Sequence, residues 1–290
     1  MLVFEWFKSW RNKNLSLNDE IIRMEINKLD FCTENNEKLF KNNGELFNGI
    51  MYRLHENGKI ETECKLKEGK IDGLFKVWYG NGKLKIEKKF KEGNEHGLGN
   101  EWYENGQLKD EKNYKSGKLN GLVKLWYENG KPEYIGDFKM DKEDGLHKGW
   151  YENGQLKHEW NFIDGYFDGV QKERYENGQL KSEINYKDGK RIGLTQDWFE
   201  NGQLLLEINY KDGKENGIFK EWNEKGKLLY NLNYIDGNFD GVQKEWYENG
   251  QLKSETNYKD GLKEGVFKFW NKNGELLNKL NYKDGKLITL

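Results

Sequence analysis

A 24-residue repeat fills this chain from Gly49 to Leu290, without an insertion or deletion between its ten copies. Each copy opens on a glycine, at residues 49, 73, 97, 121, 145, 169, 193, 217, 241 and 265. A fixed period in this range indicates an array in which each repeat packs against its neighbours rather than around one closed core. Such an array presents a long, regular surface, so the default expectation for its function is binding.

Each repeat contains two strand-like segments and two turns. In residues 241–264, segments rich in Trp, Tyr, Leu and Val are separated by Glu-Asn-Gly and by Lys-Asp-Gly. Asn and Asp tolerate unusual backbone angles, and the following glycine adopts positive φ without a Cβ clash. Three glycines per repeat and the lack of a helical stripe disfavour helix. The sequence therefore predicts an all-β fold, an elongated, twisted, single-layer antiparallel β-meander of ten hairpin repeats.

Two hairpin registers are possible when the opening glycine is counted as position 0. A two-residue Asn-Gly loop places position 5 opposite position 12 and pairs Lys244 with Glu255. A three-residue loop, a type I turn with a bulge at the glycine, places position 5 opposite position 11. We favour the three-residue loop, which aligns Trp246 with Leu252 and Glu245 with Lys253.

In this register one face of the sheet collects an apolar set. It comprises the residue after the opening glycine (Leu74, Leu98, Leu122, Leu146 and Val170), a tryptophan row, the leucine two after Asn-Gly, and the aromatic residue before the second turn. The tryptophan row is a candidate binding surface or core ladder, formed by Trp78, Trp102, Trp126, Trp150, Trp198, Trp222, Trp246 and Trp270. Rows of this kind more often form the core of a fold than a ligand platform.

The polar face carries Lys, Glu, Asn and Gln, with tyrosines at the hairpin tips. These tyrosines are a second candidate binding surface, formed by Tyr79, Tyr103, Tyr127, Tyr151, Tyr175 and Tyr247. Recurrent Lys and Glu neighbours are expected to form cross-strand pairs on a solvated surface.

The ends of the array differ from its repeats. Residues 1–37 form an N-terminal segment with a short helix expected around Asn18–Leu29, and residues 38–48 are expected to form a capping strand. Residues 49–290 hold the ten repeats, and 286–290 are expected to form a final edge strand.

The fourth repeat contains Pro132, the only proline of the chain. Proline removes a ladder N–H and is rare in central strands. We expect a bulge, a lost ladder bond or a bend between Pro132 and Gly145, which would divide the array into two stiffer halves. The alternative is that the sheet accommodates the proline at a non-pairing position.

Composition excludes several partners and locations. The net charge is −2 and both signs alternate along the strands, so neither nucleic acid nor an anionic membrane is an expected partner. No stretch approaches the ~20 apolar residues of a membrane span. Residues 1–8 lack the apolar core of a signal peptide, and Cys32 and Cys64 provide neither a disulfide framework nor metal-ligand spacing. We expect a cytoplasmic protein.

No catalytic, cofactor or metal constellation emerges from the repeats. The histidines, His55, His96, His147 and His158, share no position with a nucleophile or a carboxylate. The doubled aspartates Asp164/Asp168 and Asp236/Asp240 could suggest calcium, but that ion needs six to eight oxygen ligands. We therefore expect a protein that is not an enzyme and binds no cofactor or metal.

The motif Trp-Tyr-Glu-Asn-Gly-Gln-Leu-Lys recurs at Trp102–Lys109 and Trp246–Lys253. With the following Asn-Tyr-Lys-Asp-Gly, it resembles the MORN-variant repeat, a relative of the MORN β-hairpin repeat, over about residues 38–290. Bacterial proteins with tandem copies are commonly labelled antitoxin-like proteins of the YwqK type, of toxin–antitoxin systems. The resemblance implies elongated antiparallel sheets that bind other proteins, or membranes in some MORN proteins, and implies no catalytic motif.

Three functions from different classes follow. The first is a protein–protein interaction module, such as an antitoxin or a scaffold. The second is a glycan or cell-wall binder, because choline-binding repeats are also aromatic-glycine hairpins, although their period differs. The third is an enzyme, which no motif supports. A toxin-like neighbouring gene would favour the first function, and an export signal the second.

Overall fold

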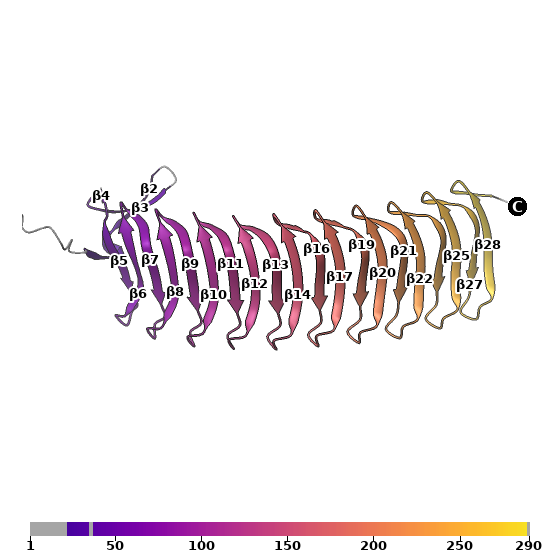
Figure 1. The fold of residues 1–290 in the computed structure, drawn as a ribbon, viewed down its shortest axis with the longest axis horizontal. Coiled ribbons are helices and arrows are strands. Elements are labelled where there is room, and N and C mark those ends of the chain that lie inside the picture. Colours follow the sequence, from indigo (N-terminus) through magenta and orange to yellow (C-terminus); the bar gives the residue numbers. More distant parts are fainter. Residues whose placement is uncertain (1–21, 35–36, 289–290) are drawn as a thin grey trace, which may run out of the picture. The chain divides into compact units, whose positions relative to one another are not determined.

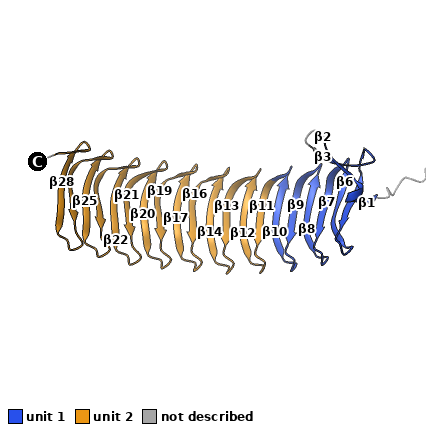
Figure 2. Ribbon diagram, turned by 180° about the vertical axis from the view of Figure 1, so that it is seen from behind, with its two compact units in different colours: residues 1–118 blue, residues 119–290 orange. Residues whose placement is uncertain are grey.

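The computed structural model describes residues 22–34 and 37–288, which belong to two compact units. Unit 1 ends at Lys118 and unit 2 runs from Leu119 to Leu290 (Figure 2). In both, successive strands follow one another in chain order and are bowed along their length (Figure 1). The prediction of an all-β, antiparallel hairpin meander is confirmed.

Unit 1 holds the N-terminal elements and the first three repeats. Its repeat strands are β5 (Gly49–Leu54), β6 (Ile60–Lys67), β7 (Lys70–Trp78), β8 (Leu84–Lys91), β9 (Asn94–Trp102) and β10 (Leu108–Lys115). They pair antiparallel with their chain neighbours. A further strand, β1 (Arg23–Glu25), pairs parallel with β5, with Met24 opposite Met51.

The helix expected around Asn18–Leu29 is wrong over the residues that the structure describes. Residues 23–25 form β1, and Ile26–Lys28 form a single 3-10 turn, η1. The parallel pairing with β5 supplies hydrogen-bond partners for this backbone, and tertiary pairing thus overrides the local helix signal. Residues 18–21 lie outside the described part.

Residues before the first repeat form a small separate sheet. It consists of β2 (Asp30–Glu34), β3 (Glu37–Asn42) and β4 (Glu45–Leu46), so residues 38–48 contain two strands. The amide of Phe40 donates to the carbonyl of Gly69 (2.9 Å). A buried cluster of Leu29, Phe47, Met51, Cys64 and Leu66 joins these elements to the first repeat.

Unit 2 holds the remaining seven repeats. Three of its strands run through the opening glycine, namely β11 (Lys118–Trp126), β13 (Lys142–Trp150) and β21 (Lys214–Trp222). Between the first two lies β12 (Pro132–Lys139). The others are β14 (Leu156–Ile163), β15 (Tyr166–Phe167), β16 (Gly169–Arg174), β17 (Leu180–Lys187), β18 (Lys190–Arg191), β19 (Gly193–Trp198), β20 (Leu204–Lys211), β22 (Leu228–Ile235), β23 (Asn238–Phe239), β24 (Gly241–Trp246), β25 (Leu252–Lys259), β26 (Leu262–Lys263), β27 (Gly265–Trp270), β28 (Leu276–Lys283) and β29 (Lys286–Leu287).

The hairpin loop is the three-residue type, but the register beyond it differs from the expected one. The amide of Gly250 donates to the carbonyl of Tyr247 (2.8 Å), and Trp246 lies opposite Leu252 as predicted. The next pair is Glu245 with Ser254, because Lys253 is an extra, bulged residue. The same shift occurs in all ten repeats. The expected pairing of Glu245 with Lys253 is therefore wrong, and Lys244 lies opposite Glu255.

This bulge decides which residues share a face, because one extra residue moves all following side chains to the other side of a strand. The outer face carries positions 1, 3 and 5 of the first strand and positions 11, 14 and 16 of the second. The inner face carries positions 2, 4, 13, 15 and 17. Three members of the expected apolar set share the outer face, namely the residue after the opening glycine, the tryptophan and the leucine two after Asn-Gly. The expectation that the aromatic residue before the second turn shares this face is wrong, because that residue lies on the inner face. Leu146, for example, lies on the outer face and Phe162 on the inner face.

The inner face forms the core, although only one layer of sheet is present. Residues at position 2 are buried in most repeats of unit 2, as in Val123, His147, Gln171, Thr195, Gln243 and Phe267. The aromatic residues at position 17 make ring contacts along the face, with centroid distances of 4.7 Å for His147–Phe162, 4.7 Å for Phe162–Phe167 and 5.2 Å for Phe167–Tyr186. A second run joins Tyr234, Phe239, Tyr258, Phe267 and Tyr282. Ring contacts between neighbouring repeats therefore replace a second layer.

Glutamine side chains complete the ladder where the opening glycine interrupts it. Between β14 and β16 the register moves from Phe162 opposite Phe167 to Glu159 opposite Lys172. In the gap, Gln171 Oε1 accepts from the amide of Asn161 (2.7 Å), and Nε2 donates to the carbonyl of Asn161 (3.0 Å). A primary amide has the donor and acceptor of a peptide group. This buried side chain therefore makes the two hydrogen bonds that a paired backbone residue would make, and we call it the glutamine rung. Gln243 makes the same pair of bonds to Asn233.

The irregularity expected between Pro132 and Gly145 lies at Gly136 rather than at the proline. Pro132 is the first residue of β12, where its missing N–H is tolerated, and lies opposite Trp126 as leucine does in other repeats. The shift in pairing with β11 matches that of other repeats, but the shift in pairing with β13 falls between Ile135 and Asp137, one position earlier than the shift between Ile208 and Tyr210 in β20. The boundary between the two units falls between Lys118 and Leu119, ahead of the proline.

Gly136 makes room for a buried hydrogen-bonded pair on the inner face. A Cβ at this position would collide with the hydroxyl of Tyr134 and the ring of His147. The glycine therefore leaves the space in which the Tyr134 hydroxyl donates to His147 Nδ1 (2.6 Å). His147 Nε2 donates to the carbonyl of Asp137 (2.7 Å), so this imidazole takes the place of the glutamine rung.

Replacing the glutamine rung should weaken the array locally. We expect Gln171→Leu to cost about 1–3 kcal/mol, because it leaves the amide of Asn161 buried without an acceptor. Urea unfolding measures the cost, and hydrogen exchange at Asn161 locates it. The matched control, Val170→Leu on the exposed outer face, should be nearly neutral. An Asn161 amide that stays fully protected in Gln171→Leu would show that the rung is dispensable.

Candidate interaction surfaces

The hairpin-tip tyrosines connect successive repeats. The hydroxyls of Tyr79, Tyr127, Tyr151, Tyr175 and Tyr247 each donate to the backbone carbonyl at position 5 of the next repeat, at 2.7–2.9 Å. In the first repeat, His55 Nε2 donates to the carbonyl of Trp78 (2.9 Å). Tyr103 is half-buried like the others, and Lys109 lies over its ring. The hairpin-tip tyrosines, predicted as a candidate binding surface, thus also hold each repeat to the next one.

Two further bonds connect the repeats at their edges. The tip asparagine donates to the carbonyl at position 7 of the next repeat, as in Asn177 to Glu200 (2.9 Å). At the second turn, Asp168 Oδ2 accepts from the amide of Asp188 (3.1 Å) and from Lys187 Nζ (3.0 Å). The backbone bond and the lysine hold the pKa of Asp168 below its usual value. Asp240 accepts from the amide of Asp260 in the same way (3.2 Å). Asp168 and Asp240, two of the four aspartates that suggested calcium, are therefore turn acceptors.

The tryptophan row lies on the outer face, at the strand ends next to the hairpin tips. All eight, Trp78, Trp102, Trp126, Trp150, Trp198, Trp222, Trp246 and Trp270, are half-buried, and each lies opposite the residue at position 11. The carbonyls of several accept the tyrosine hydroxyls of the preceding repeat. The ring ladder of the core is formed by the position-17 residues instead.

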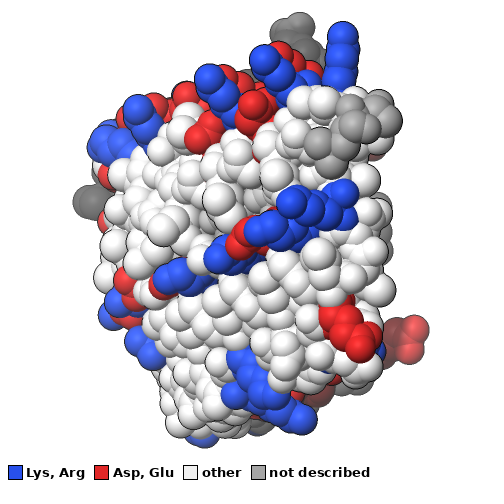
Figure 3. All heavy atoms as spheres, turned by 90° about the vertical axis from the view of Figure 1, so that its right-hand side faces the viewer, with Lys and Arg blue, Asp and Glu red and all other residues white. Residues whose placement is uncertain are grey.

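The outer face of unit 2 presents a row of exposed apolar side chains, one per repeat, at position 1. Their exposed fractions are 37–50 % for Leu122, Leu146, Val170, Leu194, Ile218, Val242 and Val266. Beside this row run cross-strand ion pairs at positions 3 and 14, including Lys148–Glu159 (3.0 Å) and Lys172–Glu183 (3.0 Å). Figure 3, which views the C-terminal end, shows charged side chains of both signs aligned in rows between broad uncharged bands. On the outer face of unit 2 the position-1 row therefore runs beside a row of ion pairs.

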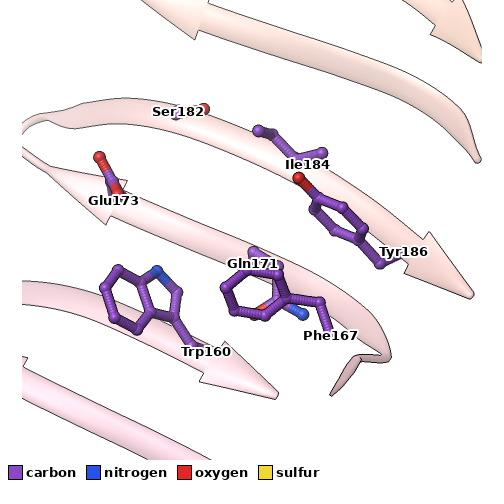
Figure 4. Close-up of a pocket in the computed structure, with 7 residues that line it drawn as sticks. All are labelled: Trp160, Phe167, Gln171, Glu173, Ser182, Ile184 and Tyr186. Carbon is purple, nitrogen blue, oxygen red and sulfur yellow. The ribbon is translucent and has the colours of Figure 1, made fainter. Parts of the chain in front are cut away.

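The inner face of unit 2 contains shallow hollows between aromatic side chains. In one, Trp160, Phe167, Ile184 and Tyr186 lie around Gln171, with Glu173 and Ser182 toward the hairpin tip (Figure 4). The Glu173 carboxylate is paired with Lys181 Nζ (3.5 Å). A second hollow lies one repeat further, around Thr195 and Ile208.

Three of the four histidines of the repeats have structural contacts. His55 and His147 donate to backbone carbonyls, and the His158 ring stacks on Trp160 with centroids 3.7 Å apart and planes inclined by 11°. Within residues 22–34 and 37–288, no group of three or more His, Cys, Asp or Glu side chains could hold a metal ion. In the same residues, no helix is long and apolar enough to cross a membrane.

Comparison with protein families gives a match over more than half of the chain. The model of the MORN repeat variant matches nine segments, 71–92, 95–116, 119–140, 143–164, 167–188, 191–212, 215–236, 239–260 and 263–284. The chain belongs to the MORN repeat variant family. No curated protein matches it significantly.

Sequence reasoning missed the inner rows of this MORN repeat variant protein at positions 2 and 15. Their residues vary from His and Gln to Phe and Val, so no single residue type marks them. Their burial depends on the bulge at position 12. No residue type marks that bulge, because position 12 is Lys, Glu or Leu in different repeats.

The hydrogen bond from the tip tyrosine to the next repeat can be removed in one repeat and added in another by single substitutions. Tyr151→Phe should cost about 0.5–1.5 kcal/mol, because the carbonyl of Arg174 loses its donor. Phe199 stands where other repeats have tyrosine, beside a hollow lined by Glu200, Asn201 and Glu224. Phe199→Tyr should therefore raise the urea midpoint by supplying the missing hydroxyl to Trp222. A Phe199→Tyr variant no more stable than the wild type would contradict this role.

His158 should make stability depend on pH. Burial, and to a lesser extent Lys157, lowers the pKa of His158 from 6.5 to about 4. A lowered pKa in the folded state means that the unfolded chain binds the proton first. Stability should therefore be constant above pH 7 and fall as the pH drops from 6.5 toward 4. Urea midpoints of wild type and His158→Gln should diverge in this window, and parallel profiles would refute the shift.

Proposed function

We propose that this protein is a non-enzymatic protein–protein interaction module that binds a partner protein along the outer face of its repeats. The observation that carries the proposal is the row of exposed apolar side chains in unit 2, from Leu122 to Val266. Surface apolar residues of a monomer are normally scattered singly. In this row one recurs in every repeat at the same position, each opposite an Asn or Asp at position 16.

The dimensions of the row suit a protein partner. Position-1 residues of successive repeats are two strands apart, about 9.5 Å, so the seven span roughly 57 Å if the strands lie flat. The ion pairs beside them, such as Lys148–Glu159 and Lys244–Glu255 (3.3 Å), supply a polar border. An apolar centre with a polar border is the usual anatomy of a protein interface.

A more specific form of the proposal is an antitoxin-like role in the cytoplasm of a bacterium. Tandem repeats of this type are commonly labelled antitoxin-like, and a regular surface could cover a toxin over several repeats. Cys64 is a free thiol, as suits a reducing compartment. A scaffold that holds another protein would use the same face.

The test places charges on the outer row. The triple variant Leu146→Glu, Leu194→Glu and Val242→Glu should lose the partner, because a buried carboxylate without a counterion is costly in an interface. The matched control adds the same charge at exposed hairpin tips, with Gln155→Glu, Gln203→Glu and Gln251→Glu. The readouts are quantitative cross-linking in cells and growth when a toxin from the neighbouring gene is co-expressed.

Partner binding and growth rescue by wild type and tip variant, but not by the outer-row variant, would support the proposal. Equal cross-linking of the two triple variants would overturn the outer face as the interface. Binding to a glycan array in place of any protein would overturn the protein-interaction function.

A further inference from the structure

A three-residue cluster recurs at the hairpin tips. In the ninth repeat, Lys253 Nζ lies 2.5 Å from Glu245 Oε1 and 5.9 Å from the ring centre of Tyr247. In the sixth repeat, Lys181 has the same relation to Glu173 (3.5 Å) and Tyr175 (6.0 Å). The bulged lysine at position 12 thus neutralises the inner-face carboxylate at position 4.

Two adjacent repeats keep the carboxylate but lack both the lysine and the tyrosine. In the seventh repeat, Asp197 is combined with Leu205 and Phe199. In the eighth, Glu221 is combined with Leu229 and Asn223. Neither carboxylate has an ion pair among residues 22–34 and 37–288, and burial raises the pKa of Glu221. The other repeats vary at these two positions. Arg53 is paired with Glu61 (2.6 Å), and the remaining combinations are Val77 with Lys85, Leu125 with Glu133, Gly149 with Lys157 and Phe269 with Leu277. A carboxylate at position 4 without a lysine at position 12 occurs only in the seventh and eighth repeats.

A hollow of about 250 Å³ begins at Asp197. Its middle is apolar, lined by Ile184, Leu206 and Ile208, and its far end carries Arg191 and Glu215. Arg191 is already engaged, since its Nε and Nη1 donate to the hydroxyls of Tyr186 (3.3 Å) and Tyr210 (3.2 Å). The hollow is smaller than a pocket for a drug-sized ligand, which usually exceeds about 300 Å³, and suits a single side chain or a short alkyl group.

Thr195 independently indicates a missing ligand in this hollow. It is 3 % exposed and lines the hollow, yet its hydroxyl has no hydrogen-bond partner within the described part of the chain. A buried hydroxyl without a partner is unfavourable, and native structures rarely leave one. At the same position, the polar side chains of His147, Gln171 and Gln243 all have partners.

We propose that this hollow binds an alkylammonium or alkylguanidinium group, with the cation at Asp197 and the alkyl stem over Ile184, Leu206 and Ile208. The cation replaces the lysine that other repeats supply from position 12, and the hydroxyl of Thr195 faces the same ligand. The group is the end of a lysine or arginine side chain of a polypeptide or a free amine. This site lies on the inner face and is separate from the outer row of the proposed function.

The test is a titration of the full chain at constant ionic strength, followed by backbone NMR shifts of Thr195 and Leu206. The probes are N-acetyl-lysine N-methylamide and n-butylammonium, with N-acetyl-norleucine N-methylamide as the uncharged control. A single small cation should bind with a Kd on the order of 1 mM. Tighter binding of the capped lysine than of butylammonium assigns the site to a polypeptide side chain, and the reverse order to a free amine.

Three variants test whether binding requires the Asp197 carboxylate without an internal lysine. Asp197→Asn should weaken binding at least tenfold, and so should Leu205→Lys, which restores the internal lysine of other repeats. Glu245→Gln, at the equivalent position of a repeat that has its own lysine, should leave binding unchanged. Circular dichroism and thermal midpoints confirm that each variant is folded.

The proposal is overturned if the norleucine control binds as well as the capped lysine, or if Asp197→Asn binds like the wild type. The absence of saturable shifts up to about 100 mM probe also overturns it. Because this titration needs no partner protein and changes no outer-face residue, it can fail or succeed independently of the growth and cross-linking tests.

Discussion

The structure depends on contacts between residues about one repeat apart, because a single-layer sheet has no second layer to bury its side chains. Rings on the inner face touch the rings of the next repeat, as Phe167 touches Tyr186. The tip tyrosine and the turn aspartate reach forward to the next backbone, as Tyr151 reaches Arg174 and Asp168 reaches Asp188. Each such bond contributes only about 0.5–1.5 kcal/mol, but it recurs in repeat after repeat. This recurrence explains why the period tolerates no insertion.

The bulge at position 12 gives the two faces different roles. It lets the lysine at that position approach the carboxylate at position 4 while the rest of the strand turns its aromatic residue inward. Without the extra residue, Tyr258 would lie on the same face as Val242 and Trp246. The inner face would then lose its ring ladder. With the bulge in place, the outer face keeps exposed aliphatic side chains that are not part of the core. These side chains are the basis of the proposed interface.

Departures from the repeat pattern are of two kinds. Some are compensated, as where Gly136 makes room for Tyr134 and His147, or where Arg53 and Glu61 exchange signs. Others are not compensated. Asp197 has Leu205 in place of the position-12 lysine, and the hydroxyl of Thr195, in the same hollow, has no partner within the described residues. A repeat protein contains its own controls, because the same position in a neighbouring repeat shows which arrangement the fold requires. Uncompensated departures are therefore the more informative guide to function.

The sequence by itself determined the repeat length, the strands, both turns and the family resemblance, because glycine and Asn or Asp at fixed spacing leave few other backbone conformations. It also indicated the pairing of Trp246 with Leu252 at the loop. The tertiary structure alone decided the faces, because one bulged residue reverses the alternation and leaves no compositional mark. It also decided the role of Tyr151 and of Asp168, whose partners lie in the next repeat. It placed residues 23–25 in a strand, because pairing with β5 outweighs a local helix signal.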